Sequence, residues 1–90
     1  MTKHNMCDQY RMESIEAFRL GMEGQGSDAL VRFIDCLVPF MESNSAMLGQ
    51  DESELLNLVF AAQQRGDYVF IADILQYVFP NSVLGRIGAN

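Results

Sequence analysis

His4 and Cys7 are the pair of residues whose types and spacing come nearest to a chemical site in this chain. Two residues separate them and Asp8 follows, a spacing that zinc ligands also use. A structural zinc site takes four ligands, and the sequence holds one histidine and two cysteines in total. A cysteine nucleophile would need this same histidine, from the first four residues of the chain, to be held rigidly beside the thiol. We therefore expect neither a metal site nor covalent catalysis.

Two pairs of carboxylates could share acid-base chemistry. Glu13 and Glu16 are three residues apart, as are Asp51 and Glu54. The first pair is typical of the solvated face of a helix. The second is typical of a helix start, where carboxylates stabilise the positive end of the helix dipole. We accordingly predict that the chain is not an enzyme and that it binds no cofactor.

The glycines of the segment 21–26 are as dense as those of a phosphate-binding loop. They follow a helical pattern instead of a strand, and the Lys-Ser or Lys-Thr of a P-loop does not follow them. A glycine run also ends a helix, because glycine adopts a positive φ without strain. We therefore interpret Gly24-Gln-Gly26 as the end of one helix, with Ser27 and Asp28 capping the next.

The charge balance argues against nucleic acid as a partner. Six Lys and Arg residues are set against twelve Asp and Glu residues, which gives a net charge of −6, and no segment gathers the cations. Neutralising phosphates needs a basic patch, so we expect no binding to nucleic acid. An acidic surface could instead occupy the nucleic-acid-binding site of a basic partner.

Neither a membrane anchor nor a secretory signal is expected. Residues 1–8 contain no apolar run, and the most apolar stretch, 68–79, is shorter than the roughly 20 residues that span a bilayer. The sequence therefore predicts a cytoplasmic protein that does not bind a membrane. In that reducing compartment Cys7 and Cys36 are expected to be free thiols, with a disulfide or a redox switch as the alternative.

Apolar residues recur at helical spacing in four segments. The predicted helices cover residues 8–23, 28–43, 51–65 and 68–79. They form a single domain, 1–90, in which we expect 1–7 to be disordered and 81–90 to be a loosely docked tail. This pattern predicts an all-α fold, namely a small up-and-down bundle of four short antiparallel helices, or three plus a docked C-terminal helix.

Local signals mark several boundaries of these helices. Pro39 lies inside the second segment and should kink or break it, because its ring clashes with the carbonyl four residues earlier. The pattern Asp51-x-x-Glu54 resembles a capping box at the start of the third segment. Gly66 should end that helix, and Asp67 should cap the fourth.

In the segment 68–79 the firmly polar residues are Asp73 and Gln76. Its branched and aromatic residues would also suit a β-strand, which is the alternative for 68–72. Because Asp73 and Gln76 are three apart, they would share one face of a helix but lie on opposite faces of a strand, and we favour the helix. Asp73 should face solvent or pair with an arginine; the candidates are Arg19, Arg32 and Arg65.

A helix that is apolar on nearly every side must be covered, and a chain of 90 residues offers little mass to cover it. We therefore predict a homodimer, or a complex with another protein. The candidate interface residues are Phe33, Phe40, Tyr68, Phe70, Ile71, Ile74, Tyr77 and Phe79. The implied function is a non-enzymatic protein–protein interaction module, such as an adaptor or a chaperone that receives an amphipathic helix. The alternative is an acidic inhibitor of a nucleic-acid-binding site.

The stretch Gly66-Asp-Tyr-Val-Phe-Ile-Ala-Asp-Ile-Leu-Gln-Tyr77 resembles a segment of small, functionally unassigned bacterial helical proteins. In those proteins an Asp-Tyr opening leads to an Ala-Asp-(Ile/Leu)-Leu-x-Tyr run. The likeness covers residues 66–77, and Val-Phe-Pro follows Tyr77 where an acidic residue would be expected. The resemblance implies a helical fold and no activity.

Overall fold

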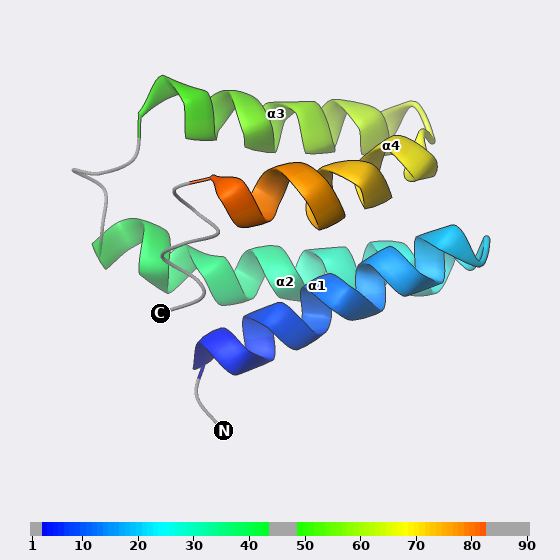
Figure 1. Ribbon diagram of the computed structural model, residues 1–90, viewed down its shortest axis with the longest axis horizontal. Helices are drawn as coiled ribbons and strands as arrows, with labels where there is room; N and C mark the ends of the chain where they lie inside the picture. Colours follow the sequence, from blue (N-terminus) through cyan, green and yellow to red (C-terminus); the bar gives the residue numbers. More distant parts are fainter. Residues whose placement is uncertain (1–2, 44–48, 83–90) are drawn as a thin grey trace.

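The computed structural model describes residues 3–43 and 49–82, and it is built from helices (Figure 1). In chain order the elements are α1 (Lys3–Arg19), α2 (Glu23–Ser43), α3 (Gln50–Gln64), α4 (Tyr68–Asp73), the π-helical turn η2 (Ile74–Val78) and the 3-10 turn η3 (Phe79–Asn81). Successive helices run in alternating directions, and the described residues contain no strand. The predicted all-α, up-and-down bundle is therefore confirmed. None of the helices in this part of the chain offers an apolar stretch that could cross a bilayer.

α4 and η2 occupy the middle of the bundle. Figure 1 shows them between α3 on one side and the α1–α2 hairpin on the other. The molecule measures 36 × 31 × 19 Å, so its shortest dimension equals about two helix diameters. The most apolar segment of the chain, 68–79, is thus flanked by α3 and by the α1–α2 hairpin.

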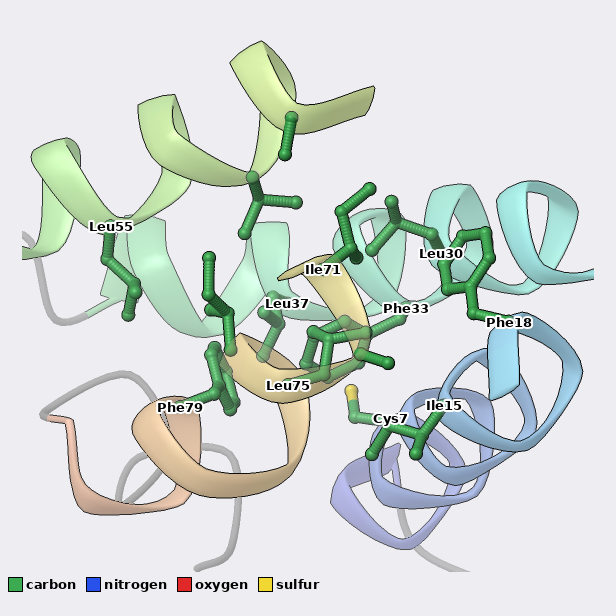
Figure 2. Packing of buried hydrophobic residues seen from close by; sticks show 14 residues of the cluster. Cys7, Ile15, Phe18, Leu30, Phe33, Leu37, Leu55, Ile71, Leu75 and Phe79 are labelled. Carbon is green, nitrogen blue, oxygen red and sulfur yellow. The ribbon is translucent and has the colours of Figure 1, made fainter. Parts of the chain in front are cut away.

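The hydrophobic core forms around this central segment. Figure 2 shows Ile71, Leu75 and Phe79 among the core side chains of α2, and all three are buried. Phe33 of α2 meets Phe79 edge to face, with ring centroids 5.0 Å apart, an arrangement that aromatic pairs favour. Burial of these side chains fixes how α4 is rotated about its axis, because its apolar side must face the other helices.

The turn between α1 and α2 lies earlier than the sequence indicated. Gly21 has a φ of +77°, a left-handed conformation that ends α1, and α2 already begins at Glu23. The predicted stop at Gly24-Gln-Gly26 and the predicted caps at Ser27 and Asp28 are therefore wrong, since all of these residues lie inside α2.

Gly26 lies inside α2 because α1 and α2 approach closely at this point. A Cβ atom at this position would overlap the ring of Phe18. The hydroxyl of Ser14 donates a hydrogen bond of 2.9 Å to the carbonyl of Gly26. Ser14 is fully buried, so this bond satisfies a polar group inside the protein. Here glycine permits helix packing and does not end a helix.

α1 begins at Lys3, within the segment 1–7 for which the sequence predicted disorder. Cys7 is only 1% exposed and forms a disulfide with Cys36 of α2, whose Cα atom lies 5.5 Å from its own. The prediction of free thiols is therefore wrong, and the alternative, a disulfide, is present. The bond ties the first turns of α1 to α2.

Two further local predictions concern Pro39 and the start of α3. α2 continues through Pro39, so the predicted break is wrong, while the predicted kink stays a prediction. Pro39 and Asp35 are exposed, so water can hydrogen-bond the Asp35 carbonyl that the proline leaves without a donor. At the start of α3 the N–H of Gly49 donates a hydrogen bond of 2.9 Å to the carboxylate of Glu52. Glu52 therefore completes the cap, and the predicted Asp51-x-x-Glu54 box does not form it.

The predicted signals after α3 are confirmed. Gly66 has a φ of +74° and ends that helix. Asp67 caps α4, because its carboxylate accepts a hydrogen bond of 3.4 Å from the N–H of Phe70. Of the predicted tail 81–90, Asn81 and Ser82 close η3, and the remainder lies outside the described residues.

The segment 68–79 is helical throughout, so the strand alternative is excluded. It widens from α to π geometry at Ile74, whose carbonyl accepts the N–H of Phe79, five residues later. Pro80 supplies a reason, because in a regular α-helix its ring would clash with the carbonyl of Gln76. The wider turn lets the helical path pass the proline.

Candidate functional site

The predicted interface residues divide into groups once the chain is folded. The buried ones are Phe33, Ile71, Ile74 and Phe79. Phe40, Tyr68 and Phe70 are partly buried against the same core, while Tyr77 is 62% exposed. The premise that the chain lacks the mass to cover the segment 68–79 is therefore wrong for the inner side of this segment. Its own α1, α2 and α3 cover that side.

Two of the partly buried rings are held by contacts within the chain. Tyr68 stacks on Phe18 of α1, with ring centroids 5.2 Å apart. The guanidinium carbon of Arg65 lies 5.5 Å from the ring centroid of Phe70, a cation–π geometry. Both rings contribute to the fold, which leaves less of their surface for a partner.

The outer side of the same segment keeps an exposed apolar surface. Val69, Tyr77 and Val78 are 64%, 62% and 50% exposed, respectively. Val69 and Tyr77 are eight residues apart and lie on one helical face, with the exposed Asp73 four residues from each and between them. We call Val69, Tyr77 and Val78 the Tyr77 surface.

Arg19 of α1 binds both polar residues of the segment. Its Nη2 atom lies 3.0 Å from Oδ1 of Asp73 and donates a hydrogen bond of 2.6 Å to Oε1 of Gln76. The prediction that Asp73 pairs with an arginine is confirmed, and so is the shared helical face of Asp73 and Gln76. All three side chains are exposed, so this network places polar groups between Val69 and Tyr77 and beside the ring of Tyr77.

Several of the reactive side chains that the sequence singled out lie within the described residues. Within the described residues no three His, Cys, Asp or Glu side chains are placed to hold a metal ion. The sulfur of Cys7 is bonded to Cys36, and a disulfide sulfur is neither a thiolate ligand nor a nucleophile. Glu13 and Glu16 are exposed on α1, as a solvated face requires.

One surface escaped sequence reasoning. Glu13 and Glu16 border a hollow of about 350 Å³ between α1 and α2, whose lining includes Leu20 and Met22. In the sequence, this surface was marked by two large apolar residues near the turn, Leu20 and Met22, which follow the carboxylates of Glu13 and Glu16. It was missed because the turn was placed several residues too late, which put Met22 on the wrong side of a helix.

Geometry is the sole guide to what these surfaces do. No protein-family profile, no curated protein and no solved structure matches this chain. The resemblance of residues 66–77 to small bacterial helical proteins therefore stays a prediction.

Proposed function

We propose that this protein is a non-enzymatic protein–protein interaction module that forms a homodimer through the Tyr77 surface. One observation carries the proposal. Val69, Tyr77 and Val78 stay at least half exposed on the outer side of a segment whose inner side forms the core. Large apolar side chains grouped on one face favour association, because burying them removes apolar surface from water.

Tyr77 has the properties of an interface anchor. Tyrosine combines a large apolar ring with a hydroxyl that can hydrogen-bond at an interface edge, and it is enriched among residues that dominate binding energy. Arg19, Asp73 and Gln76 lie beside it as a polar border. A two-fold axis near Tyr77 would set this surface against its own copy, because a symmetric dimer uses the same patch twice.

The area available sets a limit on this dimer. A stable interface buries roughly 800 Å² per partner, which is about 15% of the 5366 Å² that the chain exposes. Three side chains do not supply that area, so exposed neighbours on α1 and α4 must contribute. We therefore expect a weak dimer whose population rises with protein concentration.

Multi-angle light scattering over a concentration series tests the proposal. We expect the mean mass to rise from one chain toward two as concentration increases. Tyr77→Glu should hold the mass at one chain while the helical circular-dichroism signal remains. Leu58→Glu, which changes an exposed apolar residue on α3, should leave the dimer intact. A mass of one chain at every concentration, or equal effects of both variants, would contradict the proposal.

The second candidate function, an acidic inhibitor of a nucleic-acid-binding site, draws on the net charge of −6. Charge-driven binding weakens steeply with salt, whereas apolar docking survives it. Titrating a captured partner at two salt concentrations would separate the two functions.

The cytoplasmic location is likewise a proposal. Disulfides such as Cys7–Cys36 persist in oxidising compartments, so a cytoplasmic protein would hold this bond only reversibly. Alkylation of thiols in freshly lysed cells, followed by mass spectrometry, would establish the oxidation state in place. A fully oxidised protein under those conditions would count against the cytoplasm.

A further inference from the structure

The outer side of the α1–α2 hairpin carries a furrow that the proposed dimer does not use. Its α1 wall is one stripe of residues at intervals of three or four, namely Met6, Tyr10, Glu13, Ala17 and Leu20. The part of α1 that meets η2, represented by Arg11, lies on another side of the helix. The furrow therefore opens away from the central segment.

The α2 wall is a matching stripe. It consists of Gln25, Ala29, Arg32, Cys36 and Pro39, again spaced by three or four residues. Arg32 lines both a hollow of about 350 Å³ near the turn and one of about 390 Å³ near the disulfide. The two hollows therefore adjoin at Arg32 along the hairpin, and together they make up the furrow.

The furrow has an apolar floor and an acidic border. Ala17 and Ala29 are buried along it, and Leu20 at the turn end is 69% exposed. Four carboxylates line it, those of Glu13, Glu16, Asp28 and Asp35, against the single guanidinium of Arg32. That guanidinium already lies 3.5 Å from the carboxylate of Asp28. The border is thus strongly negative for its length.

The two walls are held at a fixed separation. The turn at Gly21 joins them at one end, and the Cys7–Cys36 disulfide joins them toward the other. Between these points the hydrogen bond from Ser14 to the Gly26 carbonyl adds a buried tie. A surface fixed in this way loses little conformational entropy when a ligand binds, which favours affinity.

We propose that this furrow binds a basic amphipathic helix of a partner protein. Its apolar side chains would lie on the floor, and its Lys and Arg side chains would meet the carboxylates of the border. From Met6 to Leu20 the α1 wall runs for about 21 Å at 1.5 Å per residue, the length of roughly four helical turns. A second copy of this chain would bring further carboxylates against the same border, so charge complementarity favours a basic partner.

This inference deepens the proposed function, because it names the class of partner, but it concerns a different face from the Tyr77 surface. The two proposals can therefore fail separately. Tyr77→Glu should abolish the dimer and leave binding in the furrow unchanged.

The probe is a fluorescein-labelled peptide of about 14 residues that carries leucines on one helical face and lysines on the other. We expect its fluorescence anisotropy to rise when the protein is added, and the affinity to fall between about 0.05 M and 0.5 M salt. The control peptide replaces every lysine by glutamate and should not bind. Failure of the lysine peptide to bind, or equal binding of the glutamate peptide, would overturn the inference.

A matched pair of charge reversals locates the site. Glu13 and Glu54 each accept a hydrogen bond from a glutamine four residues earlier on an exposed helical face, at 3.3 Å and 3.1 Å. We expect Glu13→Lys to weaken binding of the lysine peptide about tenfold, and Glu54→Lys on α3 to weaken it less than about twofold. Equal losses would mean that net charge alone attracts the peptide, which would overturn the site.

A matched pair of exposed leucines tests the floor. Leu20→Ser should weaken binding about tenfold, whereas Leu58→Ser on α3 should have no effect. If Glu13→Lys or Leu20→Ser instead changes the mass of the protein and not its affinity for the peptide, the furrow is a contact between copies. That result would also overturn the inference.

Discussion

Arg11 of α1 donates a hydrogen bond of 2.8 Å from Nη1 to the carbonyl of Leu75 in η2, across 64 positions of the sequence. Two donors that a helix would normally offer this carbonyl are occupied or missing. The N–H of Phe79 bonds the carbonyl of Ile74, and Pro80, five residues after Leu75, has no N–H. The guanidinium thus takes the place of the donor that the proline lacks, and it fixes the π turn against α1.

Removing the Arg11 side chain should therefore be costly. We expect Arg11→Ala to lower the free energy of unfolding in urea by about 1.5–3 kcal/mol, because a charged donor to a partly buried carbonyl is lost. Asp8→Asn serves as the control. It removes the exposed ion pair of 2.7 Å with the same guanidinium but leaves the carbonyl bond, and it should cost less than about 1 kcal/mol. Equal costs would show that the Leu75 carbonyl is unimportant.

The role of Pro80 predicts a coupling. In a Pro80→Ala background the new N–H can donate to the helix carbonyls, so Arg11→Ala should cost at least about 0.5 kcal/mol less than it does in the natural sequence. A double-mutant cycle in urea measures this difference. Strict additivity would contradict the substitution of one donor for the other.

Arg19 and Asp73 should behave differently from Arg11. Their side chains are 38% and 52% exposed, so water competes for the ion pair of 3.0 Å. We expect Asp73→Ala to lower the free energy of unfolding by less than about 1 kcal/mol. A loss as large as that of Arg11→Ala would mean that this network supports the fold and is more than a border of the Tyr77 surface.

Two glycines in the same helix predict opposite effects. A Cβ at Gly26 would overlap the Phe18 ring, so Gly26→Ala should destabilise the protein by about 1–3 kcal/mol. No atom lies within 4 Å of the corresponding position at Gly24, so Gly24→Ala should stabilise it by up to about 1 kcal/mol through helix propensity. Thermal unfolding followed by circular dichroism distinguishes them. The same sign for both variants would refute the close approach at Gly26.

The disulfide should make the stability of this protein sensitive to reductant. Cys7 and Cys36 are separated by 29 positions, a loop whose closure stabilises the folded state by about 3–4 kcal/mol in the chain-entropy account. We expect dithiothreitol to lower the melting temperature by about 15–25 °C. A Cys7→Ala/Cys36→Ala variant should melt at the lower temperature with or without reductant. If reductant shifts this variant as well, the shift does not come from the disulfide.

What the sequence predicted correctly depended on local physics. Asp73 and Gln76 identified a helix because a spacing of three places them on one face of a helix but on opposite faces of a strand, and Arg19 binds both. Gly66 and Asp67 marked a helix end and a cap because these roles depend on neighbouring backbone atoms alone. Such features can be recognised from a few neighbouring residues, without knowledge of the rest of the fold.

What the sequence did not reveal depended on distant contacts. A glycine that ends a helix and one that admits the Phe18 ring look alike, so Gly26 was assigned the wrong role. The disulfide requires two Cα atoms about 5.5 Å apart across neighbouring helices, and spacing along the chain does not fix that distance. The Tyr77 surface could not be predicted either, because it is the part of an apolar segment that the other helices leave exposed, and only their packing decides which part that is.

The central position of α4 and η2 has a consequence for biogenesis. This segment follows the other three helices along the chain, so the ribosome synthesises it after them. All three of these helices nevertheless pack against it in the core. Until that segment is synthesised, Leu37 and neighbouring core side chains of the α1–α2 hairpin therefore stay exposed to water. We expect a chain truncated after residue 67 to be partly helical but to melt without a cooperative transition, because it lacks the central segment on which the other helices pack.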